Sequence, residues 1–374
     1  MFRRTLVFLL STYLLLLAGC SDDESPMNGG SGRTPNPEGR LYVPNQADQT
    51  IFIYDSKTLQ RLDSISTPVV EPHFVQFTPD YKYYFIIGRQ VGGQVAKYRT
   101  SDNQLITTIT VPTVNSSQVF PTSLCVSKDG QTVFLTDFAN VAGYTHRYRV
   151  SGTDFTWLGI DSLLQAGVQT HDIRISDDGK YIISAGYNSD DITVYNTETG
   201  DLYPLTLDSA KMVFNPPSSV YGPYGVLIDH NSKMAVIACR KGIDQLRLID
   251  LRNNTILDSI IIPVDDGNEE GLRGPTYMTL LPDNNTLFVT SQRATEVSVV
   301  DLALRKVVKT IDFETPYSFG ISSSSDGSRV YVSCTNSRPA KGRVYVIDAA
   351  TYEKVDSITV GSEPYGLIWI PPVN

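Results

Sequence analysis

The chain has 374 residues, of which 41% are hydrophobic and 19% charged, and its formal net charge is −9. This composition supports a packed core and excludes wholesale disorder. The acidic balance argues against nucleic-acid binding, since neutralising phosphates needs a basic face, although it leaves room for a local basic patch.

The first 19 residues have the layout of a signal peptide. Arg3 and Arg4 precede an uncharged, Leu-rich run that ends in two small residues, Ala18 and Gly19. The run is shorter than the roughly 20 apolar residues of a membrane-spanning helix. We therefore expect residues 1–19 to be removed on export.

Cys20 directly follows this run in the sequence LLAGC. These residues resemble the lipobox of bacterial lipoproteins. The resemblance implies that Cys20 becomes an acylated N-terminus that carries chains such as palmitate, and that it anchors the protein to the outer membrane of a Gram-negative cell. The alternative is an ordinary signal peptide with a chance cysteine.

The next residues, SDDES from Ser21 to Ser25, resemble the acidic export signal of surface lipoproteins in Bacteroidetes-type bacteria. That resemblance implies a cell-surface position, whereas the alternative is a solvated acidic tether. Residues 26–40 are rich in Pro, Gly, Asn and Ser and show no apolar period. We expect residues 20–40 to form an acylated, flexible linker.

One unit then recurs along the chain. Each copy opens with a short apolar strand that begins with Pro, or once with Thr, and the openers are 41 to 53 residues apart. The openers are Pro72, Pro121, Thr170, Pro223, Pro275, Pro316 and Pro364.

Three more strands follow each of the first six openers. The second strand is apolar, as in TVFLTD and RVYVSC, the third often ends in Asp, and the fourth is weaker, as in ILDSIIIP. The Asp at the end of the third strand can cap the next turn through its carboxylate. No window shows a sustained 3.6-residue apolar period, so helices are not expected as major elements. Four short strands at this spacing are typical of a propeller blade.

The two ends of the repeat complement each other. Residues 41–68 correspond to the second, third and fourth strands of a unit, whereas the last unit has only its first strand, PYGLIWI. We expect the C-terminal strand to complete the N-terminal blade, which leaves no open edge. The sequence predicts an all-β, seven-bladed β-propeller over residues 41–374, with one blade shared by the two ends.

The segments LYVPN…IFIYD and VYVSC…VYVID, each with Pro-opened first strands, resemble the YVTN-type seven-bladed propellers of surface-layer-protein-like lipoproteins. The resemblance covers roughly residues 41–374 and identifies a fold that hosts unrelated activities. Two departures, Thr170 in place of an opening Pro and the longer turn SSSSDGS in the sixth unit, blur the local register.

Three cysteines remain after Cys20, and Cys125, Cys239 and Cys334 all lie in apolar, strand-like runs. The chain has no CxxC pair, and three scattered cysteines do not make a disulfide framework. We expect small buried thiols.

The repeat predicts where a site lies, because the start of each first strand and the loop after each second strand meet at one face of a propeller. The residues after the openers form a predicted ring: His73, Thr122, His171, Tyr224, Thr276, Tyr317 and Tyr365. The loops add Asn45, Arg89, Arg240, Arg293 and Asn336. The candidate ligand-binding residues at this channel mouth are His73, Arg89, His171, Tyr224, Arg240, Arg293, Tyr317 and Tyr365.

These residue types favour a planar or anionic ligand such as an iron chelate, a porphyrin or a glycan acid, since Arg offers planar donors and stacks on aromatic rings. The alternative is that the aromatic side chains fill the channel and the arginines pair with loop acids. Those acids are Asp265, Asp266, Glu269 and Glu270.

Metal and catalytic signals are weak. His73 and His171 are two blades apart, so no metal site and no cofactor are expected. HExxH, GxSxG and phosphate-loop motifs are absent. Similar propellers include lactonases and lyases, for which either histidine is a candidate base. No paired carboxylate is evident to orient them, so no catalytic residue is assigned.

Three functions therefore stay open. The first is a monomeric surface lipoprotein whose propeller binds a small ligand or glycan and passes it to an outer-membrane transporter. The second is a protein–protein or cell-surface interaction module with a filled channel. The third is an enzyme of the lactonase or lyase kind.

Overall fold

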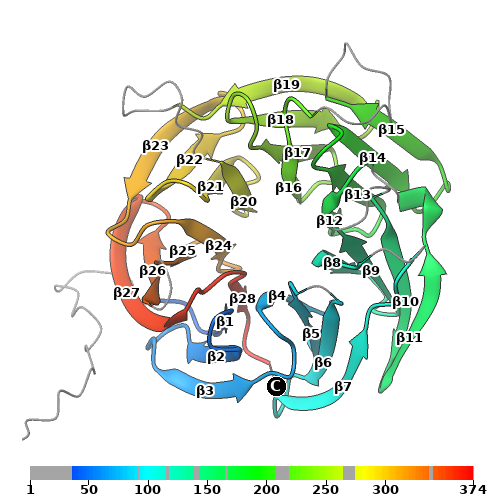
Figure 1. Cartoon of the computed structure of the whole chain (residues 1–374). Helices are drawn as coiled ribbons and strands as arrows, with labels where there is room; N and C mark the ends of the chain where they lie inside the picture. Colours follow the sequence, from blue (N-terminus) through cyan, green and yellow to red (C-terminus); the bar gives the residue numbers. More distant parts are fainter. Residues whose placement is uncertain are drawn as a thin grey trace, which may run out of the picture.

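Seven antiparallel sheets of four strands stand around one axis like the blades of a propeller (Figure 1). The computed structural model describes residues 36–90, 92–114, 118–138, 143–164, 167–207, 219–263, 274–336 and 340–373. The predicted signal peptide, Cys20 and the acidic segment after it lie outside these residues. The predicted all-β, seven-bladed propeller is confirmed.

The strands occupy the same four radial positions in every blade. The inner strands are β28 (Ile368–Ile370), β4 (Pro72–Phe77), β8 (Pro121–Val126), β12 (Thr170–Ile175), β16 (Pro223–Ile228), β20 (Pro275–Leu280) and β24 (Ser318–Ser323). The second strands are β1 (Arg40–Asn45), β5 (Tyr83–Gly88), β9 (Thr132–Asp137), β13 (Tyr181–Gly186), β17 (Met234–Cys239), β21 (Thr286–Ser291) and β25 (Arg329–Cys334).

The outer half of each blade follows the same order. The third strands are β2 (Thr50–Asp55), β6 (Gln94–Arg99), β10 (Thr145–Ser151), β14 (Asp191–Asn196), β18 (Gln245–Asp250), β22 (Glu296–Asp301) and β26 (Lys341–Asp348). The outer strands are β3 (Arg61–Ser66), β7 (Gln104–Thr110), β11 (Asp154–Ile160), β15 (Leu202–Thr206), β19 (Thr255–Ile261), β23 (Lys306–Asp312) and β27 (Glu353–Ser362). The helical content of the described residues is one 3-10 turn, η1 (Ser162–Leu164), and none of their helices has the length and apolar character to cross a bilayer.

Strands from both ends of the chain share the blade that closes the ring. β28 pairs antiparallel with β1, with Trp369 opposite Leu41, and the sheet order is β28-β1-β2-β3. The Trp369 indole N–H also donates to the hydroxyl of Ser56, in the turn between β2 and β3, at 3.0 Å. The predicted closure is therefore present.

The hydrophobic core lies mainly between neighbouring blades, and one cluster also includes aromatic residues of the inner strands β4, β16, β20 and β24. The cluster beside the closing blade joins Leu41 and Val43 of β1 to Val344 and Val346 of β26 in the preceding blade, with Trp369 between them. Each sheet can bury this apolar surface only by packing against the neighbouring sheets, so the blades stabilise one another. The three predicted buried thiols, Cys125, Cys239 and Cys334, are free and buried in the described structure.

Aspartates fix the turns at one face of the ring, which we call the base. The Asp250 carboxylate accepts hydrogen bonds from the backbone N–H groups of Arg252 and Asn253, and Asp348 does the same for Ala350 and Thr351. These contacts confirm the capping role predicted for the third-strand Asp residues.

The inner strands approach one another too closely for side chains at some positions. A Cβ atom added to Gly225 would lie 1.8 Å from the carbonyl oxygen of Thr276, and one added to Gly320 would lie 2.2 Å from that of Tyr365. The Tyr365 carbonyl is also hydrogen-bonded across the blade boundary, since the Ser333 hydroxyl donates to its oxygen at 2.7 Å. Backbone contact between blades therefore sets the width of the ring.

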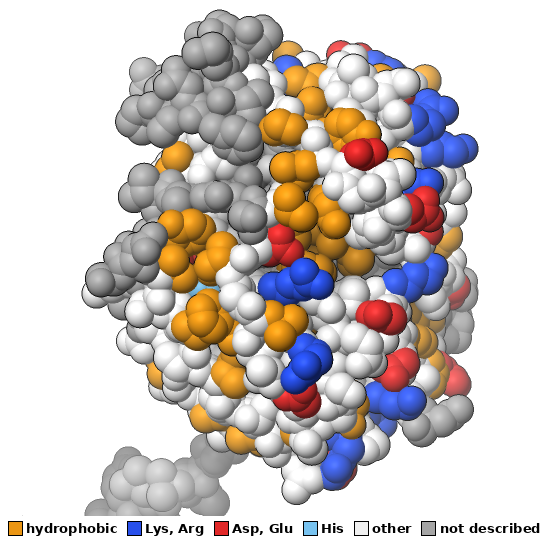
Figure 2. Space-filling view, turned by 90° about the vertical axis from the view of Figure 1, so that its right-hand side faces the viewer, with side chains coloured by type: hydrophobic (Ala, Val, Ile, Leu, Met, Phe, Trp, Pro, Cys, Tyr) orange, Lys and Arg blue, Asp and Glu red, His pale blue; other side chains and the backbone are white. Residues whose placement is uncertain are grey.

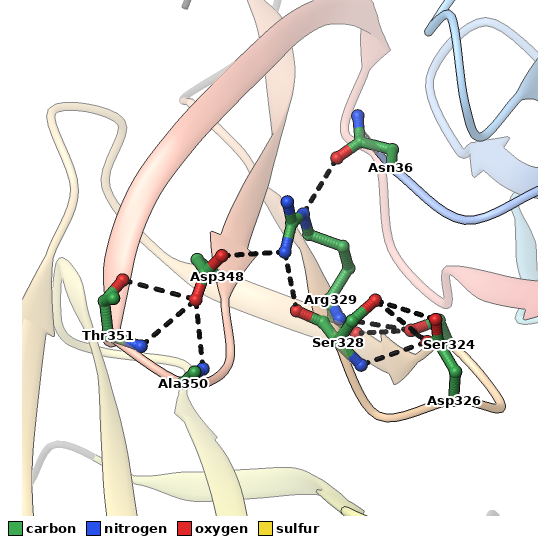
Figure 3. Close-up of polar contacts among 8 residues, drawn as sticks. All are labelled: Asn36, Ser324, Asp326, Ser328, Arg329, Asp348, Ala350 and Thr351. Atoms are coloured by element: carbon green, nitrogen blue, oxygen red, sulfur yellow. Dashed lines mark hydrogen bonds and ion pairs between the residues drawn. The ribbon is translucent and has the colours of Figure 1, made fainter. Parts of the chain in front are cut away.

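The N-terminal end of the described chain is fastened at the base. The side chain of Arg329, which is 2% exposed, donates from Nε to Asn36 Oδ1 at 3.0 Å and from Nη1 to Asp348 Oδ2 at 2.8 Å (Figure 3). The Ser56 hydroxyl donates to the Pro37 carbonyl at 2.7 Å. The chain therefore enters the ring beside the turns of the base.

The outer strands carry both charged and apolar side chains toward solvent. Figure 2 looks onto the side formed by β10, β11 and β15 and shows apolar side chains gathered between basic and acidic ones. On β11, Trp157 is 41% and Leu158 50% exposed, while Phe155 packs inward at 5.3 Å from the ring of Phe85. The unpaired edge of each sheet belongs to its outer strand and lies on the outside of the ring.

We expect Gly225→Ala to lower the free energy of unfolding by about 3 kcal/mol, because the methyl group must displace a backbone carbonyl of the next blade. Gly200→Ala is the matched control, since Gly200 has a φ of 78° and no atom within 4 Å of an added Cβ. The control should cost only about 1 kcal/mol, the penalty of a left-handed backbone. Urea unfolding of both variants measures the difference, and equal losses would contradict this view of the ring.

Candidate functional site

A cavity of about 180 Å³ opens at the face of the ring opposite the base, which we call the mouth. It is lined by Arg89, Phe120, Thr122, Phe138, His171, Tyr187, Tyr224, Arg240 and Gln292. Three of these residues begin the inner strands β8, β12 and β16, and five follow the second strands of successive blades. The repeat therefore positions the lining as the sequence analysis expected.

Four of the predicted site residues meet in this cavity: Arg89, His171, Tyr224 and Arg240. His73 and Tyr365 lie in the neighbouring part of the ring, where they are buried and their ring centroids are 3.8 Å apart. Arg293 follows the lining residue Gln292 and is exposed on the rim.

The position predicted for Tyr317 is wrong. β24 begins at Ser318, which pairs with Cys334, and so Phe319 occupies the ring position, with its ring centroid 4.1 Å from that of Tyr365. Tyr317 is 41% exposed and has a φ of 59°. The reason is local geometry, since a residue with positive φ lies immediately before five of the inner strands and, in the closing blade, immediately before the opening Pro364. These residues are Glu71, Gln169, Gly222, Gly274, Tyr317 and Glu363. In the sixth repeat, the opening Pro precedes this turn instead of following it.

A stacked column forms one wall of the cavity. The imidazole of His171 stacks on the ring of Tyr224, with centroids 3.4 Å apart. The guanidinium carbon of Arg240 lies 4.3 Å from the centroid of the same Tyr224 ring. Arg240 is only 8% exposed, and its Nε is buried without a hydrogen-bond partner among the described residues. A second cation, Arg89, lies 5.7 Å from the ring of Phe120. The cavity is therefore cationic and aromatic, and the described residues of its lining include no Asp or Glu.

The hydrogen bonds of His171 determine which of its nitrogens carries the proton. Nδ1 lies 2.9 Å from the carbonyl oxygen of Tyr224, which can only accept, so Nδ1 donates. Burial, with further contributions from the charges of Arg240 and Arg89, lowers the pKa of His171 well below 6.5 despite the Tyr224 carbonyl. His171 is neutral at pH 7, and its Nε2 keeps a lone pair at the cavity wall.

His73 has a different environment. Its Nδ1 lies 2.7 Å from Nε2 of Gln46, and burial, then the charges of Arg89 and His171, lower its pKa well below 6.5. The imidazole is 1% exposed and stacks on Tyr365. His73 therefore contributes to the wall of the ring rather than to the lining of the cavity.

Aromatic side chains of the inner strands meet around a smaller second cavity of about 50 Å³, whose lining includes Phe74 and Tyr277. The rings of Phe74 and Tyr277 meet with centroids 5.0 Å apart, and Tyr277 also lies 5.9 Å from Tyr224. Asp172, from the strand that carries His171, accepts hydrogen bonds from the Ser123 hydroxyl at 2.5 Å and the Val226 N–H at 2.9 Å, which ties three inner strands together. The channel therefore contains aromatic contacts as well as two cavities, and both interpretations of the mouth stay open.

The loop acids expected to pair with the arginines, Asp265, Asp266, Glu269 and Glu270, lie outside the described residues. Within the described ranges, no group of three or more His, Cys, Asp or Glu side chains has the arrangement of a metal site. The cavity's polar groups are instead suited to hold an organic anion through the two guanidinium groups.

The sequence analysis missed Phe138, Tyr187 and Gln292 in the lining. Each follows a second strand, at the position that Arg89 and Arg240 occupy in their own blades. The signal was therefore available, and applying one positional rule to every loop would have found them. Phe120, just before β8, has no counterpart among the candidate residues.

Comparisons with known proteins agree with this architecture. A family model described as "Lactonase, 7-bladed beta-propeller" matches residues 107–338. Comparison with curated proteins finds no match.

Several solved structures share the fold. A periplasmic gluconolactonase of Pseudomonas aeruginosa is 18% identical, with a TM-score of 0.67, and the match covers 89% of this chain and 99% of the other. A functionally unknown protein of Desulfotomaculum acetoxidans is 12% identical, with a TM-score of 0.68 over 90% of this chain and 100% of the other. A dihydro-heme d1 dehydrogenase is 13% identical, with a TM-score of 0.60 over 90% and 76%. Such low identities establish the fold alone.

We expect a histidine NMR titration to separate the mouth from the base. His73 and His171 should stay neutral as the pH falls through 6.5, because burial opposes their charged forms. Partial burial also opposes protonation of His230, but the Asp177 carboxylate at 2.8 Å and the Leu280 carbonyl outweigh it and raise its pKa. The stability that His230 adds should therefore be complete below pH 6.5 and be lost as the pH rises through its folded pKa.

Single His→Gln variants assign the signals. Titration of His171 near pH 6.5 would contradict the buried, neutral imidazole described here.

Proposed function

The chain belongs to the family of seven-bladed β-propeller lactonases, and from this membership we propose that its mouth binds a small organic anion. The ligand is held by Arg240 and Arg89 and stacks against the aromatic wall. Whether it is only bound or also hydrolysed divides the proposal into two candidate functions.

The buried Arg240 guanidinium carries the proposal. A cation that is 8% exposed and lacks a carboxylate partner in the described structure is costly to keep desolvated. Its stacking on Tyr224 offsets part of that cost. A carboxylate or phosphate that enters the cavity supplies the missing charge and accepts planar hydrogen bonds from the guanidinium.

The size of the cavity limits the ligand. About 180 Å³ is below the 300–1,000 Å³ of sites that enclose drug-sized molecules. A single ring or a short acid fits inside, whereas a porphyrin would enter only in part. We therefore favour a small acid, or the terminal acidic residue of a glycan, over an iron chelate or porphyrin.

Lactone hydrolysis is the second candidate, and the proton arrangement of His171 favours it. In this reaction, a water oxygen bonds to the lactone carbonyl carbon while Nε2 of His171 takes the water proton. The ring C–O bond then breaks, and the leaving oxygen recovers that proton. The two guanidinium groups stabilise the intermediate oxyanion and the carboxylate product. The gluconolactonase that shares the fold makes this family of substrates the first to test.

The location of the protein is part of the proposal. The lipobox-like LLAGC and the acidic SDDES support an acyl anchor at Cys20 and a surface position on the outer membrane. There the mouth collects its ligand from the medium, and an outer-membrane transporter is the proposed recipient. A protein or cell-surface partner remains the competing use of the same face.

Arg240→Gln should weaken binding of gluconate about tenfold to a hundredfold, because a charge-assisted hydrogen bond to the ligand is lost. Arg293→Gln is the matched control, since Arg293 lies on the rim of the next blade but does not line the cavity. Native mass spectrometry against a panel of small carboxylates, gluconate included, measures both variants. Equal effects of the two substitutions would remove Arg240 from the site.

Hydrolysis is tested with gluconolactone and a pH-stat. If the protein is a lactonase, acid release should stop in His171→Gln, while gluconate binding by that variant persists because the two arginines remain. No acid release by the unaltered protein leaves binding as the function.

Cys20→Ser should abolish both palmitate incorporation and membrane association, since the serine hydroxyl cannot form the thioether. Metabolic labelling with palmitate, followed by membrane fractionation, measures the two effects. Protease treatment of intact cells then tests the surface position, which is contradicted if the propeller is protected in intact cells and cleaved in lysed ones.

A further inference from the structure

The attachment of the chain before β1 gives the propeller a fixed lower side. Asn36 accepts a hydrogen bond from Arg329, and the Glu38 carboxylate pairs with Lys57 at 2.8 Å. At Gly39, an added Cβ would lie 2.6 Å from the indole of Trp369, so this residue is pressed against the closing strand. Residues 36–39 are therefore part of the ring rather than of a free linker.

These contacts all lie at the base. Arg329 follows the turn between β24 and β25, and Lys57 lies in the turn between β2 and β3. Both turns are at the end of the strands opposite Arg240 and Gln292, which follow second strands at the mouth. The tether therefore leaves the ring at the base, whereas the ligand cavity opens at the opposite face, the mouth.

We propose that the tether holds the mouth away from the membrane and turns the base toward it. This inference rests on the lipid anchor of the proposed function. It adds an orientation, in which the ligand enters from the medium and the turns of the base face the lipid surface.

Chain length supports this orientation. The 16 residues from 20 to 35 lie between the proposed anchor and the first described residue. A flexible coil of 16 residues spans about 22 Å on average. To bring the mouth to the membrane, the tether must run from the base past the two outer strands of its blade and then along the length of a six-residue strand to the mouth. This path is at least about 30 Å long. The inverted orientation is reachable, since a fully extended tether spans about 55 Å, but it requires a stretched chain.

Electrostatics provides the competing force. Among the described residues, the cavity presents Arg89 and Arg240 with no acidic side chain in its lining, and Arg293 is exposed beside it. An anionic lipid surface attracts such a face within a Debye length of about 8 Å. The tether geometry and the charge of the mouth therefore predict opposite orientations on an anionic membrane, which makes the test decisive.

The experiment uses the full-length lipidated protein in vesicles of phosphatidylethanolamine and phosphatidylglycerol that carry a headgroup quencher. One fluorophore is placed at the base with Lys82→Cys and, separately, at the mouth with Arg293→Cys. Both native side chains are exposed, whereas Cys125, Cys239 and Cys334 are buried, and burial raises the pKa of Cys125 to about 12, so these thiols resist labelling.

We expect severalfold stronger quenching of the Lys82→Cys label than of the Arg293→Cys label. Insertion of a 20-residue Gly/Ser stretch between Gly32 and Arg33 should remove most of this difference while leaving vesicle binding intact, because the longer tether reaches the mouth without stretching. Equal quenching in the unmodified tether, or stronger quenching of the mouth label, would overturn the proposed orientation.

The anchor itself is tested separately in the same assay. Failure of the unaltered protein to bind vesicles would overturn the lipid anchor and the orientation with it. Binding with the mouth label more strongly quenched would overturn the orientation alone. Repeating the measurement without phosphatidylglycerol separates the two forces, since only the attraction of the mouth depends on anionic lipid.

Discussion

The close approach of the seven inner strands is the constraint on which the rest of the structure depends. Gly225 and Gly320 leave no space for a side chain, and Ser333 bonds the Tyr365 carbonyl across a blade boundary. Because backbone meets backbone, the ring cannot narrow or widen without breaking these contacts. The loops after the second strands are attached to this rigid frame, and the mouth keeps its shape although five of its lining residues come from short loops.

Rigidity also explains how a buried charge is retained at the mouth. Arg240 is held against Tyr224, which in turn lies on His171, and the His171 backbone oxygen accepts a hydrogen bond from Thr122 at 2.7 Å. A flexible loop would turn the guanidinium toward water. Here the stacked column keeps the guanidinium at the cavity wall. The free-energy cost of removing Arg240 from water is therefore part of folding rather than of ligand binding, and the affinity for an anion is greater.

The sequence predicted the architecture because each blade repeats its own local signals. The capping Asp250 and Asp348, the apolar second strands and the incomplete first and last units all follow from residue order alone. The positional rule also brought Arg89, His171, Tyr224 and Arg240 together. The rule failed at Tyr317, because the start of β24 depends on which residue before it adopts a positive φ. Pro316, two residues before the first residue of β24, gives no signal for that choice. The burial of Arg240 depends on packing between blades, which no local pattern contains.

The pairing of β28 with β1 has a consequence for the order of events during synthesis. A ribosome that has delivered residues up to 362 has produced six sheets with all four strands, but β1 still has an unpaired edge. The ring is therefore completed only after residues 368–370 emerge. Until then the free edge of β1 can pair with other strands, so a nascent chain is exposed to mispairing at the blade that later closes the ring.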